Sequence, residues 1–325
     1  MPPVSGFTWH DGERAIHFGR GRIAEAVELL PDGYVLLTTE RAQTDAPAVV
    51  EAAAEVHLVG PGLVDELSAE LLPNVGREGM VVGLGGGRVV DTAKAVGGAT
   101  GRPAGAIPTT LSAAEMTKIH RTPAGIADAK RIRPAFVLND PALCASQPPA
   151  ELAASAANSL AHAVEAQCTT MASPVPTLAA REAARLIDAA YAGEIEDIQR
   201  DHLALAALLS GYAIDAAWYG LSHVMSQTLV RVGGAGHGQA NAAVLPYTIG
   251  ALERRRPGYV DPDASLRDLA RRLAEHAGAD GIRKIGVAEE KLAECARAGA
   301  QRAELDLTPP RADEAELLEL YRQAW

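Results

Sequence analysis

The residues best suited to chemistry lie in one short glycine-rich stretch. Residues 83–94 read GLGGGRVVDTAK, the apolar run Met80 to Val82 precedes them, and a helical pattern follows. A strand, a glycine turn and a helix start are typical of a phosphate site. Gly85, Gly86 and Gly87 let the backbone approach an anion, and the first N–H groups of the helix point at it. The spacing is neither G-x-G-x-x-G nor a Walker A loop, so a glycine turn with a purely structural role is the alternative.

Two adjacent hydroxyl side chains are a second candidate. Thr109 and Thr110 follow the apolar segment Gly105 to Ile107, which we expect to be a strand. Open α/β sheets bind ligands at the carboxyl ends of their strands, where hydroxyls can bond a ribose or a phosphate. A threonine that caps a turn is the alternative interpretation.

Histidines in the second half are candidates for acid–base chemistry. Asn158 and His162 are four residues apart in a predicted helix, so they share one face. His223 lies in the cluster Ser222 to Gln227, and His237 lies between two glycines in a predicted loop. Because the unperturbed pKa of histidine is about 6.5, these rings are suited to proton transfer at neutral pH. A histidine simply packed on a helix face is the alternative.

The first half has the alternation of an α/β sheet. Helical patterns near 21–30, 62–72 and 88–98 lie between short apolar segments. Strands that alternate with helices predict right-handed βαβ units and a mostly parallel sheet. The candidate strands are Tyr34 to Leu37, Val56 to Val59, Met80 to Leu84, Gly105 to Ile107 and Ala135 to Leu138.

The second half has a helical pattern throughout. From about residue 151 the chain is rich in Ala and Leu with a period near 3.6, which predicts helices. X-Pro steps between Asn139 and Pro149 break regular structure and mark a boundary. We therefore expect a dinucleotide-binding α/β domain over 1–150 and an all-helical substrate and catalytic domain over 151–325. The clearest helical stretches are 151–170, 176–192, 198–219 and 266–276.

Composition excludes several classes of function. The chain has 325 residues, 48% of them hydrophobic, and a net charge of −11. The negative charge and the lack of a basic stripe argue against nucleic-acid binding through phosphates. No apolar run reaches the ~18 residues of a membrane span, and the N-terminus does not have the pattern of a secretory signal. Three isolated cysteines suggest a reducing compartment and form no zinc pattern, so we expect a cytoplasmic protein.

Six short elements, in chain order, carry a family resemblance. They are Phe18-Gly19-Arg20-Gly21, GGG-x-x-x-D-x-A-K at 85–94, Pro108-Thr109-Thr110, Asn139-Asp140-Pro141, the stretch 158–166 (NSLAHAVEA), and 237–241 (HGQAN) before Val244-Leu245-Pro246. Together they resemble the iron-containing alcohol dehydrogenase family, and the resemblance covers nearly the whole chain. It implies a dehydroquinate synthase-like fold: an α/β N-terminal nucleotide-binding domain with a Rossmann-like parallel sheet, followed by an all-α C-terminal domain.

Within the family, the chain is similar to the maleylacetate reductase branch. Pro108 to Thr117 has the short spacing of that branch between the threonine pair and Glu115, and Asn158 stands where metal-dependent relatives carry an Asp ligand. Thr39 stands where NAD-selective relatives often have an acid that bonds the ribose 2′-hydroxyl and repels a 2′-phosphate. Thr39 therefore permits NADPH, whereas the adjacent Glu40 leaves NADH open.

The resemblance also implies cofactor contacts beyond the glycines and the threonine pair. Arg88 replaces the Ser that usually follows the glycine triplet, so its planar guanidinium either clamps a phosphate or crowds the pyrophosphate. The expected cofactor-binding residues are Thr39, Gly85, Gly86, Gly87, Arg88, Asp91, Lys94, Thr109 and Thr110, and the expected cofactor is NAD(P)H.

The metal positions of the family are altered in this chain. Metal-dependent members use an Asp and three His, and residue-by-residue matching places Asn158, His162, Gln227 and His237 there. Asn and Gln are weak ligands for iron or zinc, and no thiolate or carboxylate compensates. We therefore expect no metal. Maleylacetate reductases resemble metal-dependent members in keeping a His at the Gln227 position, which leaves a different substrate open.

A metal-free mechanism follows from these residues. His162, His223 and His237 would supply a hydrogen bond or a proton while hydride arrives from the nicotinamide. Asn158 and Gln227 would orient the substrate without adding charge.

Three functions remain open. The first is a metal-independent NAD(P)H-dependent reductase of an unsaturated keto acid or a similar carbonyl compound. The second is a family member recruited to a biosynthetic step on a different substrate, by cyclisation or a redox-neutral reaction. The third is a non-catalytic ligand-binding homologue. We expect a small-molecule substrate, neither a nucleic-acid nor a membrane partner, and a homodimer.

Overall fold

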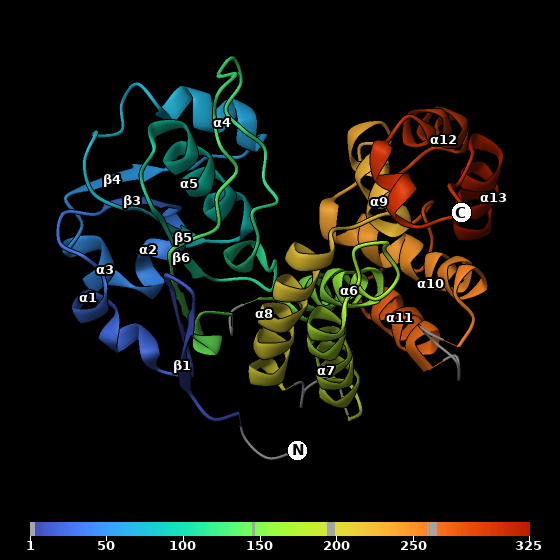
Figure 1. The fold of residues 1–325 in the computed structure, drawn as a ribbon, viewed down its shortest axis with the longest axis horizontal. Coiled ribbons are helices and arrows are strands. Elements are labelled where there is room, and N and C mark those ends of the chain that lie inside the picture. Colours follow the sequence, from blue (N-terminus) through green and yellow to red (C-terminus); the bar gives the residue numbers. More distant parts are fainter. Residues whose placement is uncertain (1–3, 145–146, 194–198, 259, 261–264) are drawn as a thin grey trace. The chain divides into compact units, whose positions relative to one another are not determined.

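The chain folds into two compact units. The computed structural model describes residues 4–144, 147–193, 199–258, 260 and 265–325 (Figure 1). Unit 1 comprises Met1–Ser146 and Gln199–Gly211, and unit 2 comprises Gln147–Ile198 and Tyr212–Trp325. The helix α8 (Arg200–Ala217) contributes residues to both units. The two domains that we expected from the sequence were each a single contiguous segment, so they did not include this exchange.

Unit 1 is built on a seven-stranded, mostly parallel sheet. Its strand order is β1-β2-β7-β6-β5-β3-β4, and only the β1–β2 pair is antiparallel. All five predicted strands are present, which confirms the α/β class. The strands are β1 (Phe7–Asp11), β2 (Arg14–Phe18), β3 (Val35–Thr38), β4 (Glu55–Leu58), β5 (Val81–Gly85), β6 (Ala104–Pro108) and β7 (Phe136–Asn139).

The antiparallel β1–β2 hairpin is the part of the sheet that the sequence pattern did not predict. The two strands read FTWHD and RAIHF, and each mixes polar with apolar residues. At the edge of the sheet, β1 alternates between half-buried and exposed residues. Such a strand lacks the continuous apolar run of a strand buried on both faces.

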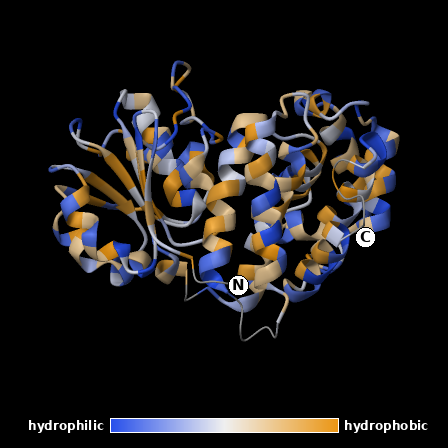
Figure 2. Cartoon of the chain, turned by 60° about the horizontal axis from the view of Figure 1, so that its bottom comes forward, coloured by the Kyte–Doolittle hydropathy of each residue, from blue (hydrophilic) through white to orange (hydrophobic). Residues whose placement is uncertain are grey.

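Helices cover both faces of this sheet. Leu36, Val82 and Leu84 point to one face and pack with α1, α2 and α3, whereas Val35 and Val81 point to the other face and pack with α4 and α5. Figure 2 shows the hydrophobic strands between these amphipathic helices. The helices are α1 (Ala26–Leu29), α2 (Glu40–Asp45), α3 (Pro47–Glu51), α4 (Val64–Leu71) and α5 (Gly87–Thr100).

The strand order reverses between β3 and β5. The chain passes from β3 outward to β4, and then from β5 to β6 and β7 in the opposite direction. The carboxyl ends of β3 and β5, where Thr38 pairs with Leu84, therefore form a topological switch point. In open α/β sheets this is the place where ligands bind.

Unit 2 is all-helical in the part that the structure describes. Predicted stretches 151–170, 176–192 and 266–276 correspond to α6, α7 and α11, and the stretch 198–219 corresponds to α8, although residue 198 lies outside the described residues. The helices of this half are α6 (Pro149–Ala166), α7 (Pro174–Ala190), α9 (Leu221–Arg231), α10 (His237–Arg255), α11 (Ser265–His276), α12 (Leu292–Ala300) and α13 (Glu314–Ala324).

The helices α6 and α10 are central to unit 2. They pack on each other, and both also pack on α9 and α11. Buried alanines along α6, such as Ala157, Ala161 and Ala163, fit this close packing. Within the described ranges, no single helix is long and apolar enough to cross a membrane; only the bent pair α8 plus α9 passes that test together.

Candidate functional site

The glycine turn lies at the carboxyl end of β5, on the switch point. Gly85 ends the strand with φ +156°, Gly86 is the N-cap and Gly87 begins α5. An ideal Cβ on Gly85 would lie 2.9 Å from Cγ2 of Val89, and one on Gly87 would lie 2.8 Å from Cβ of Ser112. The fold therefore requires glycine at both positions. The first N–H groups of the 14-residue helix α5 carry its positive dipole end, which suits a phosphate.

The structure brings the threonine pair against this turn. The backbone N–H of Thr109 donates to the oxygen of Gly85 over 3.0 Å. The methyl group of Thr110 lies 3.3 Å from an ideal Cβ on Gly86. Both threonines follow β6, which pairs with β5, so two neighbouring strand ends supply the turn and the hydroxyls.

Thr39 lies at the third strand end of this edge. It follows β3 and caps α2, because its hydroxyl accepts from the N–H of Ala42 over 3.2 Å. Its neighbour Thr38 donates to the backbone oxygen of Leu84 over 2.9 Å and so ties β3 to β5. Thr39, the turn and the threonine pair therefore share one edge of the sheet.

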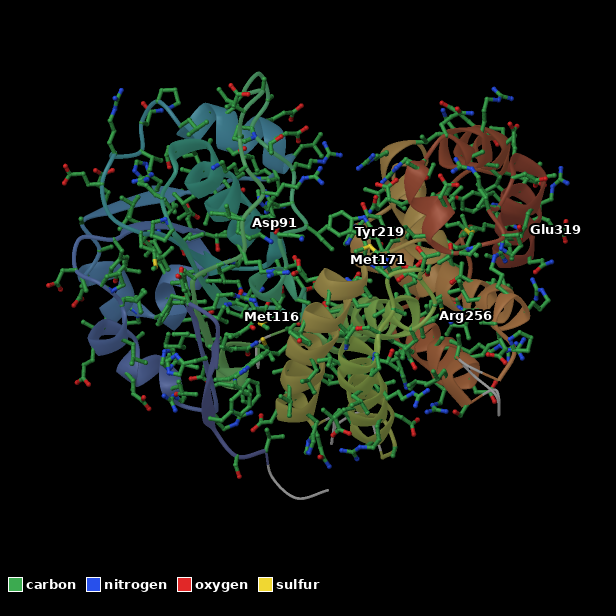
Figure 3. The ribbon with its side chains drawn as sticks, viewed as in Figure 1. Asp91, Met116, Met171, Tyr219, Arg256 and Glu319 are labelled. Carbon is green, nitrogen blue, oxygen red and sulfur yellow. The ribbon has the colours of Figure 1, made fainter. Side chains whose placement is uncertain are left out.

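The three predicted contacts on α5 differ in their surroundings. Arg88 is exposed at the start of the helix. Asp91 (Figure 3) pairs with Lys94, whose Nζ lies 2.7 Å from Oδ1. Lys94 is fully buried and donates to the backbone oxygens of Ala114 and Thr117 over 2.8 and 2.9 Å. Its ammonium group thus holds the segment 114–117 in this structure.

Glu115 is a buried acid in that segment which the sequence did not single out as a site residue. Its side chain is fully buried, Asn139 donates to its Oε1 over 3.1 Å, and its Oε2 is buried without a hydrogen-bond partner among the described residues. Burial raises the pKa of Glu115 to about 7, against the opposing charges of Lys94 and Arg14. The available signal was the position of this Glu between Ala114 and Met116 in the motif around the threonine pair, because a charged residue between apolar neighbours is unusual.

In unit 2, an amide network determines the state of His162. Asn158 and His162 lie one turn apart on α6, with Asn158 Nδ2 3.4 Å from His162 Nε2. Asn241 of α10 donates to Asn158 Oδ1 over 2.9 Å and to the backbone oxygen of His237 over 3.2 Å. A carbonyl only accepts, so it fixes the Asn241 amide, which in turn directs the Asn158 NH₂ group at His162. His162 Nε2 is therefore the acceptor in its neutral ring.

His223 stacks on His162 and is bonded to a carboxylate. The two imidazoles have centroids 4.9 Å apart at an interplanar angle of 14°. His223 Nδ1 bonds to Oε2 of Glu165, which lies on α6 one turn after His162 and is fully buried. The ring centroid of Tyr219 (Figure 3) lies 5.5 Å from that of His223. Burial, and then the charges of His223 and His237, lower the pKa of His162 well below its usual value.

His237 and Gln227 are not placed as the sequence suggested. His237 is the exposed first residue of α10, so the predicted loop there is wrong: the helix extends from His237 through the apolar stretch to Arg255. Gln227 lies one turn after His223 on α9, and its Oε1 accepts from Arg302 over 3.1 Å. The residue of α9 that packs on His162 is thus His223.

We call Asn158, His162, Glu165, His223, His237 and Asn241 the histidine cluster. Sequence reasoning missed Glu165 and Asn241, although both belong to motifs that carry the family resemblance. Glu165 is three residues after His162 and therefore on the same helix face, which was an available signal.

The histidine cluster, as far as the structure describes it, offers imidazoles to a dication but no carboxylate that is free of other bonds. The oxygen of Asn158 already accepts from Asn241, and the only carboxylate in the cluster, that of Glu165, is bonded to His223 and to backbone N–H groups. Across the described ranges, no group of three or more His, Cys, Asp or Glu side chains is arranged to hold a metal ion. Iron binding favours anionic or imidazole ligands with free lone pairs.

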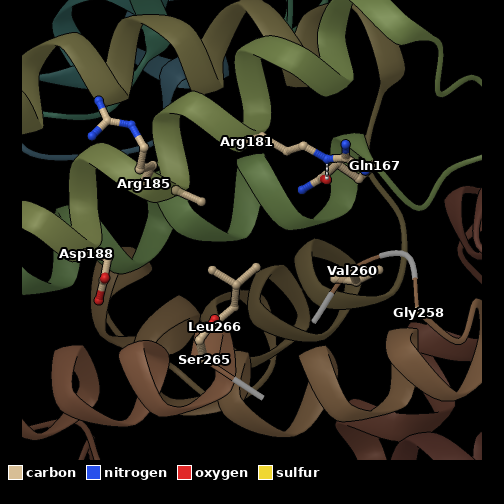
Figure 4. A pocket seen from close by; sticks show the side chains of 9 residues that line it. Gln167, Arg181, Arg185, Asp188, Gly258, Val260, Ser265 and Leu266 are labelled. Carbon is tan, nitrogen blue, oxygen red and sulfur yellow. Dashed lines mark hydrogen bonds between the residues drawn. The ribbon is translucent and has the colours of Figure 1, made fainter. Parts of the chain in front are cut away.

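A cavity elsewhere in unit 2 contains none of the predicted site residues. It has a volume of about 370 Å³ (Figure 4). Arg181 donates to Gln167 at its wall over 3.2 Å. Its remaining lining residues are Ala184, Arg185, Asp188, Gly258, Val260, Ser265 and Leu266.

Known proteins match both regions. Residues 42–120 match the family model of the iron-containing alcohol dehydrogenases, and residues 152–281 match that of the Fe-containing alcohol dehydrogenase family, C-terminal. Maleylacetate reductase of Sphingobium indicum is 30% identical over 309 residues, which cover 88% of this chain and 82% of the relative. The chain belongs to the iron-containing alcohol dehydrogenase family.

Two further maleylacetate reductases are similar to this chain. Maleylacetate reductase of Pseudomonas aeruginosa is 28% identical over 285 residues, 79% of either chain. The crystal structure of maleylacetate reductase from a Rhizobium strain superposes with a TM-score of 0.83 at 25% identity, covering 100% of this chain and 99% of the other. Iron-containing alcohol dehydrogenases use NAD(P)H, and this chain is an oxidoreductase of that family. The matched ranges include the glycine turn and the histidine cluster.

Proposed function

We propose that this chain is an NAD(P)H-dependent reductase that transfers hydride to a carbonyl or unsaturated keto acid of the maleylacetate type, without a catalytic metal. The observation that carries the proposal is the glycine turn at the switch point of unit 1. There the end of β5 and the N-terminus of α5 lie on the same edge of the sheet as the hydroxyls that follow β3 and β6. This combination suits the pyrophosphate and ribose of a dinucleotide.

Under this proposal, some residues of unit 1 contact the cofactor and others support the fold. Gly85, Gly86 and Gly87 admit the pyrophosphate, and Thr109 and Thr110 are the hydroxyls beside it. Arg88, exposed at the same helix start, is available to a phosphate. The bound nicotinamide supplies the hydride.

Lys94 has a structural role instead, because its ammonium group is already bonded to protein oxygens. It supports the segment 114–117, and we assign it no phosphate contact.

Metal independence is part of the proposal because of the chemistry of the donors. An ion beside Asn158 would compete with Asn241 for the amide oxygen, and it would gain no negative charge to offset its desolvation. The imidazoles then act as hydrogen-bonding and proton-transfer groups.

The relatives support the substrate class. Maleylacetate reductases of Pseudomonas aeruginosa and Sphingobium indicum align with 79% and 88% of this chain, and maleylacetate is an unsaturated keto dicarboxylate. His237, exposed at the start of α10, and the Asn158 amide are the groups we assign to substrate orientation. Gln227, bonded to Arg302, has the weaker claim to this role.

The test is a fluorescence titration with NADH and NADPH, followed by a panel of carbonyl substrates that includes maleylacetate. We expect saturable binding of a reduced nicotinamide and loss of its absorbance with maleylacetate or a related keto acid. Failure to bind either nucleotide would leave a non-catalytic homologue. Binding without turnover across the panel would favour the biosynthetic alternative.

A further inference from the structure

Glu115 is a buried acid of unit 1 that the proposed reaction does not use. It lies in the short helix η2 (Ala114–Met116), and its side chain is fully buried. Asn139, which ends β7, donates from its amide Nδ2 to Glu115 Oε1 over 3.1 Å. No arginine or lysine side chain among the described residues forms an ion pair with this carboxyl group. Burial of a carboxylate without a bonded cation is costly, so the neutral acid is favoured.

One oxygen of each side chain in this pair has no hydrogen-bond partner. Within the described residues, Oε2 of Glu115 and Oδ1 of Asn139 are both buried and both unpaired. Two such oxygens only accept when the acid is ionised, whereas a neutral carboxyl group carries one O–H donor. A hydrogen on Oε2 would therefore satisfy both atoms at once, through an O–H···Oδ1 bond beside the Nδ2–H···Oε1 bond. Buried unpaired polar atoms call for an explanation, and one hydrogen explains both.

The charges around Glu115 only partly oppose the neutral form. Burial raises the pKa of Glu115 to about 7, although the charges of Lys94 and Arg14 lower it. Lys94 also pairs with Asp91, and Arg14 with Asp11. The helix α8 meets the two neighbours of η2 through Gly211, which has no side chain. The other titratable groups on the surrounding elements are Asp140 beside Asn139, Cys144 of η3 (Pro141–Cys144), and Arg200, Asp201, His202, Tyr212 and Asp215 of α8.

The segment 112–117 packs directly on the glycine turn. A Cβ on Gly87 would lie 2.8 Å from Cβ of Ser112, so no space separates the segment from the first residue of α5. Ala113 has a φ of +62°, a left-handed conformation that is strained for alanine and persists only where the surroundings impose it. The bond from Asn139 to Glu115 is one of the contacts that impose it. A charge on Glu115 would remove the O–H bond of the pair and favour hydration of the segment, at the expense of its packing on the turn.

We propose that Glu115 is a positioning residue that acts as a neutral acid: its reciprocal pair with Asn139 holds the segment 112–117 on the glycine turn, and ionisation of Glu115 weakens dinucleotide binding there. The inference rests on the proposed function, which assigns the dinucleotide to this turn. The folded protein keeps a proton that the unfolded chain loses at the ordinary pKa of 4.5. The stabilisation by Glu115 is therefore complete below that pH, and it is lost as the pH rises through the folded-state pKa of about 7.

The direct test is the protonation state of Glu115 in the protein without nucleotide. Infrared spectroscopy separates the carbonyl stretch of a neutral carboxylic acid from that of a carboxylate, and the signal of Glu115 is the one lost in Glu115→Gln. We expect the acid band at about pH 6 and its loss by about pH 8.5. A folded wild type without this band at about pH 6 would overturn the proposal, whether or not the protein binds a nucleotide.

The variant Glu115→Gln mimics the neutral acid at every pH. Its NH₂ group replaces the O–H as donor to Asn139 Oδ1, and its oxygen still accepts from Nδ2. In a fluorescence titration with NADH and NADPH at about pH 6, we expect the two proteins to agree in Kd within about twofold. Between about pH 6 and about pH 8.5, the Kd of the wild type should rise about fivefold or more relative to that of the variant. The same pH dependence in both proteins would overturn the coupling.

Two further variants separate the pair from other effects. Glu115→Met cannot form the pair, so its affinity should be lower than that of Glu115→Gln at both pH values; wild-type affinity at about pH 6 would overturn the positioning role. Glu66, an exposed acid of α4, is the matched control, and Glu66→Gln should keep the pH dependence of the wild type. If neither the wild type nor Glu115→Gln binds NADH or NADPH, the reductase function is refuted, and the infrared band still decides whether Glu115 is neutral.

Discussion

At the scale of single residues, burial and bonding distinguish the side chains that hold the fold from the exposed ones that we assign to a ligand. Lys94 lies in the motif that carries the family resemblance, yet it is fully buried and its bonds go to Asp91, Ala114 and Thr117. Arg88, six residues earlier on the same helix, is exposed. Burial and bonding, which residue type alone does not reveal, separate the two cations.

Replacing Lys94 therefore tests a structural role. Lys94→Met should lower the free energy of unfolding by about 3–5 kcal/mol, because it leaves the partners of a buried ion pair without their cation. Urea unfolding without nucleotide is the measurement. Arg88→Met on the same helix is the control, with an expected change within about 0.5 kcal/mol. If Lys94 instead served only the cofactor, the nucleotide-free protein would be as stable as the wild type.

At the scale of elements, the site depends on where strands and helices end. The turn after β5, the cap Thr39 after β3 and the threonine pair after β6 lie at one edge because parallel strands share their direction. In unit 2, a side chain of α6 caps α9, and a side chain of α10 orients Asn158 on α6. The start of α9 and the Asn158 amide are thus each fixed by a side chain of another helix.

A valine at Gly86 tests the turn as an element. Its Cβ would lie 3.3 Å from Thr110, a tight but movable side chain, so the protein should fold. Its branched side chain would occupy the phosphate site, and dinucleotide affinity should fall at least ~10-fold, about 1.4 kcal/mol, by fluorescence titration. Gly193→Val is the control, because an added Cβ there meets open space. Unchanged affinity in folded Gly86→Val would place the phosphates elsewhere.

The order of elements was largely predictable from the sequence, and the partners within the site were not. Continuous apolar runs such as Val81 to Leu84 gave the buried strands, whereas the polar residues of β1 concealed an edge strand. Glycines around His237 suggested a loop, but the helix α10 begins there because Gly236 serves as its N-cap. The Asn158–Asn241 bond joins residues 83 positions apart, and no local pattern encodes such a contact.

At the scale of the whole molecule, the chain combines an α/β unit, to which we assign the nucleotide, with a helical unit. Among the described residues of the histidine cluster, no carboxylate is free to bind metal. Family membership implies hydride chemistry with NAD(P)H, while the amide network around Asn158 argues against the iron of the family name. The central claim is therefore hydride transfer that relies on imidazoles and amides in place of a Lewis acid.

The most direct test of that claim is turnover by metal-depleted protein. Purified protein would be treated with EDTA, its iron and zinc content measured by elemental analysis, and NAD(P)H oxidation followed with maleylacetate. We predict substoichiometric metal before treatment and an unchanged kcat after it. Stoichiometric iron or zinc in the purified protein, or activity that EDTA abolishes and added metal restores, would contradict the account.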